Sequence, residues 1–175
     1  MTQTDIAFMR QALLLADKAS SMGEVPVGAV IVQDGRVIAC GYNRRECDKN
    51  ALRHAELSAI DEACRVLGGW RLPRCTLYVT LEPCPMCTGA IVNARIDRVV
   101  FGAYDKKAGA CGSVLDLMAF PLNHKAQIEG GVPEEECAAK LKEFFLCLRE
   151  KRKSVKNVSD SATKNAGSPS FSFKK

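Results

Sequence analysis

The stretch TLYVTLEPCPMC, residues 76–87, contains the change of pattern that decides the fold. Residues 76–80 are mostly apolar, β-branched or aromatic, and this composition predicts a strand. Proline is favoured in the first turn of a helix, so the segment after Pro83 predicts a helix over about residues 84–94. A strand that leads directly into a helix is typical of an α/β domain, in which helices cover both faces of a sheet.

Outward from this stretch, strands and helices continue to alternate. Asp34-Gly35 lies between two apolar runs and predicts a tight hairpin. The other boundaries follow from apolar periodicity, helix caps and glycine stops. We expect helices over about 5–22, 54–67 and 133–152, a short helix near 114–118, and strands over 27–32, 37–42, 99–102 and 126–129.

The composition indicates one globular domain. The chain has 175 residues, of which 47% are hydrophobic and 26% charged, so a disordered or fibrous chain is excluded. No run approaches 18 apolar residues, which predicts that no segment crosses a membrane. The first five residues lack the basic and apolar start of an export signal, so we expect a cytoplasmic protein.

The positive charge is concentrated at the end of the chain. The formal net charge is +5, but residues 151–175 contain seven Lys or Arg and one acid, which leaves a net charge of −1 on residues 1–150. From about Ser154 the composition shifts to Ser, Lys, Asn, Gly and Pro, and such a segment buries too little apolar surface to fold alone. We therefore predict a folded domain over 1–153 and a disordered basic tail over 154–175. The charge of the whole chain does not mark the domain itself as a nucleic-acid binder.

Nine cysteines are present, an odd number in a chain with no export signal, so a disulfide framework is not expected. We interpret most of them, including Cys40, Cys64 and Cys147, as small core residues. Only Cys84 and Cys87 have the spacing of metal ligands. Two cysteines at positions i and i+3 of a helix's first turn share one face, where the helix dipole favours the thiolate.

His54 supplies a third metal ligand. One imidazole and two thiolates suit zinc and leave its fourth tetrahedral position to water, as in catalytic zinc sites. A structural site would need a fourth protein ligand, and three candidates remain: Cys75, Cys111 and His124. Glu56 could transfer protons between the metal's water and a substrate. Residues two apart do not face each other within a helix, so His54 and Glu56 must lie where the helix begins.

Longer stretches resemble the bacterial tRNA-specific adenosine deaminases over roughly residues 4–150. The His-x-Glu and Pro-Cys-x-x-Cys strings are a general signature of zinc deaminases, shared with guanine and cytosine deaminases. The narrower likeness lies in residues 101–110, with Gly112-Ser113 and Asn123-His124. The matching stretches are EVPVGAVIV (24–32), Asn43, His54-Ala55-Glu56, TLEPCPMCTGAI (80–91) and FGAYDKKAGA (101–110).

The resemblance implies a cytidine-deaminase-like fold, in which a five-stranded mixed sheet lies between helices, and a homodimer with one zinc ion per subunit. It implies hydrolytic deamination of adenosine to inosine at wobble position 34 of an arginine tRNA, with a zinc-bound hydroxide attacking C6. The site residues that it implies are His54, Cys84 and Cys87 as zinc ligands, Glu56 as proton shuttle, and Asn43, Asp105, Asn123 and His124 as substrate contacts.

Two departures affect the expected contacts with tRNA. Phe144-Phe145 is followed by Leu146-Cys147-Leu148 where the family tends to carry basic residues, and the stretch before Asn123 is one residue short. Two other functions remain open: deamination of a free base or nucleoside such as guanine or cytosine, and a non-catalytic, zinc-stabilised RNA-binding subunit. A local basic rim around the motifs would favour RNA, and its candidate residues are Arg44, Arg45, Lys49, Arg53, Lys106 and Lys107.

Overall fold

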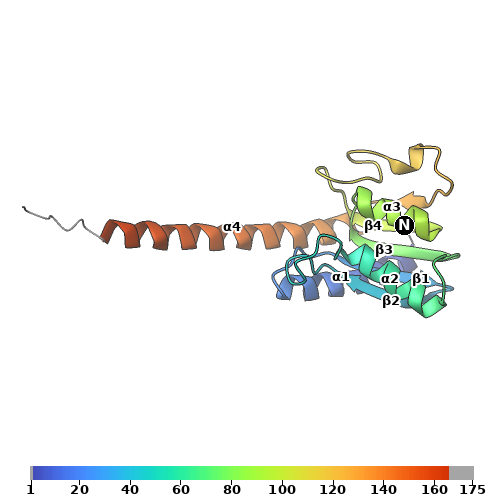
Figure 1. Cartoon of the computed structure of the whole chain (residues 1–175), viewed down its shortest axis with the longest axis horizontal. Helices are drawn as coiled ribbons and strands as arrows, with labels where there is room; N and C mark the ends of the chain where they lie inside the picture. Colours follow the sequence, from blue (N-terminus) through green and yellow to red (C-terminus); the bar gives the residue numbers. More distant parts are fainter. Residues whose placement is uncertain (1, 166–175) are drawn as a thin grey trace, which may run out of the picture. The chain divides into compact units, whose positions relative to one another are not determined.

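The computed structural model describes residues 2–165, with side chains as far as residue 154 (Figure 1). Its sheet has five strands in the order β2-β1-β3-β4-β5. β1 pairs antiparallel with both β2 and β3, whereas β4 pairs parallel with both β3 and β5, so the sheet is mixed. The strands are β1 Gly28–Gln33, β2 Arg36–Tyr42, β3 Cys75–Leu81, β4 Arg98–Ala103 and β5 Gln127–Glu129.

Helices cover both faces of this sheet, as the sequence predicts. One buried cluster joins the sheet to α2 (Ala55–Leu67) and α3 (Pro85–Ala94). The other joins the opposite face to α1 (Gln3–Ser21), with Cys137 from the first turn of α4. The three-layer α/β/α architecture and the five-stranded mixed sheet are therefore confirmed (Figure 1).

The beginning of α2 lies directly against β2 because the strand has no side chain at Gly41. A Cβ atom at this position would lie 2.0 Å from the carbonyl oxygen of Ala55 and 2.7 Å from the backbone nitrogen of Ala59. Only glycine permits so close an approach of helix and strand. The contact fixes the first turn of α2, which begins directly after His54.

Two expected boundaries were wrong. The short helix near 114–118 is a single 3-10 turn, η1, over Leu117–Ala119. The last helix, α4, spans Glu134–Asn165 and so continues past residue 152 into the segment predicted to be a disordered tail. The physical reason is that no glycine or proline interrupts the helix before Gly167 and Pro169. No helix within residues 2–165 combines the length and the apolar character needed to cross a membrane.

The described chain consists of two compact units. Residues 2–141 contain the sheet, and the described part of the second unit, residues 142–165, begins within α4. The predicted boundary between residues 153 and 154 stays a prediction, and residues 166–175 of the predicted tail lie outside the described residues.

All nine cysteines are free thiols, as expected, but they are not all core residues. Cys40 is exposed because β2 alternates: Ala39 and Gly41 on either side of it are buried. Cys147 on α4 is also exposed, and Cys64 on α2 is half-buried. The prediction of a core position was therefore wrong for Cys40 and Cys147, whereas Cys64 packs against the edge of the core.

A network of charged side chains ties α1 to the sheet. The Asp5 carboxylate accepts hydrogen bonds from Arg98 Nη1 at 2.7 Å and from the Tyr78 hydroxyl at 2.9 Å. Arg98 also pairs with Glu129 on β5 at 2.5 Å. Asp5 caps α1 as well, because it bonds the backbone nitrogen and hydroxyl of Thr2 at 2.9 and 2.7 Å. The Arg98 guanidinium is the main reason that the pKa of Asp5 lies well below its ordinary value.

Candidate functional site

The N-termini of α2 and α3 bring three metal-ligating side chains together. His54 is the N-cap of α2 and Cys84 is the N-cap of α3, and both have extended backbone conformations that turn the chain into the helix. Pro85 at the first position of α3 favours this start. The ligand atoms of His54, Cys84 and Cys87 all lie within 4.8 Å of one another. His54 Nδ1 is 3.7 Å from the Cys84 sulfur and 3.5 Å from the Cys87 sulfur.

The three side chains already interact as ligands of one centre would. Hydrogen bonds from the Cys87 thiol and from His54 lower the pKa of Cys84 to about 4, so Cys84 is a thiolate at neutral pH. The hydrogen bond to Cys84 and burial raise the pKa of Cys87 above its ordinary value, and binding of a metal would release this proton. A half-buried imidazole with two cysteine sulfurs is a donor set that fits zinc.

The alternative fourth ligands lie elsewhere. The Cys111 sulfur is 3.6 Å from the Thr88 hydroxyl, and His124 Nε2 is 2.7 Å from the carbonyl oxygen of Ile96. Cys75 is buried at the start of β3, the opposite end of the strand from Cys84. Within residues 2–154, His54, Cys84 and Cys87 are the only three His, Cys, Asp or Glu side chains grouped for a metal ion. This arrangement leaves one tetrahedral position open, as in catalytic sites.

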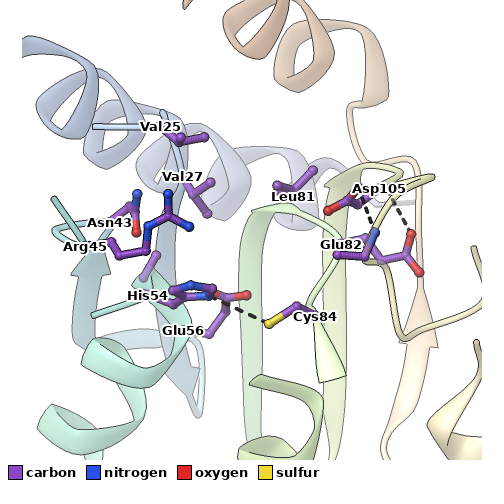
Figure 2. Close-up of a pocket in the computed structure, with 12 residues that line it drawn as sticks. Val25, Val27, Asn43, Arg45, His54, Glu56, Leu81, Glu82, Cys84 and Asp105 are labelled. Atoms are coloured by element: carbon purple, nitrogen blue, oxygen red, sulfur yellow. Dashed lines mark hydrogen bonds between the residues drawn. The ribbon is translucent and has the colours of Figure 1, made fainter. Parts of the chain in front are cut away.

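Glu56 lies in the first turn of α2 and reaches the same pocket as His54 (Figure 2). The two residues can face one cavity because His54 precedes the helix and Glu56 is inside it, as predicted from their spacing. The Glu56 side chain is only 4% exposed. Burial disfavours its charged form and raises its pKa above the ordinary value for a glutamate.

The pocket is a cavity of about 220 Å³. His54, Glu56 and Cys84 form its floor, and two walls rise on either side of them. In Figure 2, Asn43 and Arg45 lie on one side, Glu82 and Asp105 lie on the other, and the groups that could bind metal lie between them. Apolar side chains and two alanines complete the lining. They are Val25, Val27, Ala55, Leu81 and Ala108.

A buried carboxylate supports each wall. Glu24 is fully buried, and it accepts hydrogen bonds from Asn43 Nδ2 at 3.2 Å and from the backbone nitrogen of Cys47 at 2.7 Å. Glu82 accepts a hydrogen bond from the backbone nitrogen of Asp105 at 3.0 Å. Asn43 is itself only 8% exposed, so its amide is fixed at the pocket edge rather than free in solvent.

Comparisons with known proteins agree with this geometry. The MafB19-like deaminase family matches residues 3–149. The tRNA-specific adenosine deaminase of Bacillus subtilis is 49% identical over 91% of this chain and 100% of its own length, and that of Haemophilus influenzae is 46% identical over 87% and 89%.

Two solved structures of deaminases also match this fold. A structure from a study of A-to-I editing by tRNA:A34 deaminases at the wobble position has a TM-score of 0.75 and 46% identity, and the match covers 77% of this chain and 99% of that one. A guanine deaminase from Bacillus subtilis matches less of the fold, with a TM-score of 0.55 and 42% identity over 59% of this chain and 66% of that one.

The chain belongs to the tRNA-specific adenosine deaminase family. The predicted fold and the predicted membership of this family are therefore confirmed.

In this family member, Asn123 and His124 do not line the pocket with Asn43 and Asp105. Asn123 Oδ1 accepts a hydrogen bond from Arg95 at 2.8 Å, just after the end of α3, and His124 contacts Ile96. Their predicted contact with substrate therefore stays a prediction about a surface outside the cavity.

Of the six residues predicted to form a basic rim, only one lines the pocket. Arg44 and Arg53 both pair with Asp48, at 2.9 and 3.4 Å, and neither lines the cavity. Arg45 does line it, beside Asn43, and its guanidinium also pairs with Glu46 at 2.9 Å. Sequence reasoning did not single out Glu24 and Glu82 within their motifs. The one feature of the sequence that could have indicated their burial is that each lies next to an apolar segment expected to be buried.

Proposed function

We propose that this chain is a hydrolase that converts adenosine to inosine at wobble position 34 in the anticodon loop of an arginine tRNA. One observation carries the proposal: a His-Cys-Cys group and a buried Glu56 form the floor of a cavity whose walls hold Asn43 and Asp105. Relatives that carry the name tRNA-specific adenosine deaminase at 49% and 46% identity supply the substrate class.

His54, Cys84 and Cys87 would hold one zinc ion in each subunit. When bound, zinc lowers the pKa of a water molecule in its open coordination position toward about 7 and so supplies a nucleophile at neutral pH. The other steps belong to the protein. The first turn of α2 holds Glu56 beside the metal ligands, where its side chain is almost fully buried.

Glu56 accepts one proton from the attacking water and gives it to the purine ring nitrogen. It then takes the remaining hydroxyl proton and gives it to the leaving amino group. The water oxygen forms a bond to C6, the bond from C6 to the amino nitrogen breaks, and ammonia leaves. Inosine with a C6 carbonyl remains. Burial of Glu56 favours its protonated form, which suits a group that must return the proton it accepts.

The walls would select a base that has left its stack. A target base inside an anticodon loop must swing out of the stack to reach a buried site. Asn43 would hold the flipped nucleotide, because its amide is fixed by Glu24 and can still donate or accept at the pocket edge. Asp105 on the opposite wall would contact a neighbouring nucleotide. Asn123 and His124 would contact the anticodon loop outside the cavity.

Arg45 favours a phosphate-bearing substrate over a free base. Among the pocket-lining residues it is the only Lys or Arg, and its protein partner, the exposed Glu46 at 2.9 Å, lies outside the lining. Exposed pairs of this kind are weak, so a substrate phosphate could compete for the guanidinium. A neutral base alone offers this guanidinium no anionic partner, whereas the phosphates on either side of a flipped nucleotide do. This observation weighs against the second candidate, a guanine-type or cytosine-type deaminase of free bases or nucleosides.

The deciding experiment is an inosine assay on the zinc-loaded protein. The substrates are an arginine tRNA anticodon stem-loop, free adenosine, guanine and cytosine, assayed side by side. We expect inosine at position 34 and no comparable release of ammonia from the three small molecules. Rapid guanine turnover without inosine would instead support the second candidate. No turnover of any substrate by folded protein that contains zinc would support a non-catalytic RNA-binding subunit.

The proposed homodimer needs a separate measurement, because the family resemblance is its only support. Light scattering coupled to size-exclusion chromatography should give a mass near twice the 19.0 kDa of one chain. A mass equal to one chain at micromolar concentration would contradict it.

A further inference from the structure

Glu82 is a buried carboxylate that the proposed reaction does not use. It lies between the last residue of β3 and Cys84, and only 2% of its surface is exposed. Burying a carboxylate is costly unless its oxygens accept hydrogen bonds, so its partners indicate what it is for. Its hydrogen-bond partners are the backbone nitrogens of Asp105, Cys111 and Ser113.

All these partners lie on one loop. Glu82 Oε2 accepts from the backbone nitrogen of Asp105, and Oε1 accepts from the backbone nitrogens of Cys111 and Ser113, each at 3.0 Å. The side chain therefore holds the segment after β4, here called the 104–113 loop, near both of its ends. Charge-assisted hydrogen bonds of this kind are among the stronger ones in proteins.

The loop also leaves space for this carboxylate. A Cβ atom at Gly109 would lie 2.3 Å from both Cδ and Oε2 of Glu82, and 2.6 Å from the carbonyl oxygen of Asp105. No real Cβ tolerates such distances, so only glycine lets the loop close over Glu82. The contact therefore depends on both segments: Glu82 supplies the carboxylate, and Gly109 leaves the space that it occupies.

The 104–113 loop is the second wall of the pocket, since Asp105 and Ala108 line the cavity (Figure 2). It is joined to the metal-binding segment by a backbone hydrogen bond as well, from Ala110 to the carbonyl oxygen of Pro83 at 2.8 Å. A loop that fluctuates reduces apparent affinity by the fraction of time that it spends in the competent position.

We propose that Glu82 is a positioning residue that holds the 104–113 loop, and with it Asp105, in the substrate-binding position relative to the metal-binding helix α3. Its role in substrate binding rests on the proposed function, whereas its hold on the loop does not. Glu82 acts through the loop and makes no contact with the reacting atoms.

The first test is Glu82→Gln, which keeps the size of the side chain but turns a donor amide toward backbone N–H donors. We expect the amides of residues 105, 111 and 113 to exchange with solvent roughly tenfold faster, because a charged hydrogen-bonding partner has been lost. The KM for the anticodon stem-loop should rise by a similar factor, about tenfold, while kcat at saturation changes far less. Zinc content should stay at the wild-type value.

A double-mutant cycle separates positioning from general stability. If Glu82 acts through Asp105, then Asp105→Ala should add little to the KM of the Glu82→Gln variant. Glu24→Gln is the matched control, because Glu24 is a second buried carboxylate that holds the opposite wall through Asn43 and Cys47. Its effect on KM should add fully to that of Asp105→Ala, and it should leave exchange at residues 105, 111 and 113 unchanged.

Gly109→Ala approaches the same contact from the loop and keeps the proposal testable if Glu82→Gln folds poorly. It should reproduce the faster exchange and the higher KM. The proposal is overturned if Glu82→Gln lowers stability with KM unchanged, loses zinc, or combines additively with Asp105→Ala. If the wild-type protein forms no inosine, the proposed function fails, but amide exchange still tests the hold of Glu82 on the loop.

Discussion

Two clusters of buried and half-buried polar side chains lie against different faces of the sheet, and they differ in how their charges are satisfied. Asp5, Tyr78, Arg98 and Glu129 form a closed network in which the Asp5 carboxylate faces Arg98 at 2.7 Å. His54, Glu56, Cys84 and Cys87 face a cavity instead. In the first cluster the opposite charge is part of the fold. In the second it must come from a metal ion and a substrate.

This difference separates stability from chemistry. A carboxylate that is paired with a guanidinium has a lowered pKa and stays ionised, so it stabilises the folded state. A carboxylate buried beside a pocket has a raised pKa and can exchange a proton with a substrate, at some cost in stability. Changes in the pocket cluster should therefore remove activity without unfolding the protein, and changes in the paired cluster should do the reverse.

The largest expected effect is that of Cys84→Ser. It removes the sulfur that is ionised most readily, so metal content measured by mass spectrometry should fall from about one zinc per chain to near zero, and inosine formation should be abolished. Cys40→Ser is the matched control, because Cys40 is exposed on β2 and lies outside the metal group. Full zinc and full activity in Cys84→Ser would remove this residue from the metal centre.

Glu56→Gln should have the next largest effect. Loss of general acid–base transfer should lower kcat by roughly 10²- to 10⁴-fold. Zinc content should be unchanged, and the free energy of unfolding should be equal or higher, because a buried carboxylate has been replaced by a neutral group of the same size. Glu56→Ala should also keep its metal. Turnover at the wild-type rate in either variant would exclude Glu56 from the proton transfers.

The candidate metal site was predictable because its signals are local. His54 and Cys84 are N-cap residues and Cys87 lies in the first turn of α3. The spacing of each motif and the proline after Cys84 indicate these helix starts directly. The convergence of His54 with the cysteines was predicted from ligand chemistry, and the structure places the side chains together.

The walls were less predictable because their contacts join segments far apart in the chain. Nothing in the residues around Glu82 indicates that its partners are the backbone nitrogens of residues 105, 111 and 113. The likeness to relatives placed Asn43 and Asp105 at the pocket, and the structure agrees, but it leaves Asn123 and His124 outside the cavity. The end of α4 was misplaced because composition alone does not separate a polar helix from a tail.

A smaller effect is expected from Asp5→Asn, which breaks the paired cluster. It leaves Arg98 with Glu129 as its remaining carboxylate partner, so the free energy of unfolding should fall by about 2–3 kcal/mol at pH 7 in urea titrations. The kcat and KM of the folded variant should match wild type, since Asp5 lies outside the pocket lining. A loss of activity with unchanged stability would reverse the assignment of the two clusters.

The smallest effect is the pH dependence of the difference in unfolding free energy between wild type and Asp5→Asn. The pKa of Asp5 is lowered on folding from its ordinary value of 3.8, chiefly by Arg98, so its contribution to stability is fully present above the unfolded pKa and is lost as pH falls through the folded pKa. The gap in unfolding free energy between wild type and Asp5→Asn should therefore be constant from about pH 5 to 8 and shrink below about pH 4. Both proteins carry the same metal ligands, so release of zinc in acid cancels in the comparison.

Asp17→Asn is the control: Asp17 is half-exposed and paired with Lys140, and its loss should change stability by less than about 1 kcal/mol at any pH. A gap between wild type and Asp5→Asn that stays constant down to pH 3 would mean that the stability of the paired cluster comes from packing and neutral hydrogen bonds rather than from the charge of Asp5.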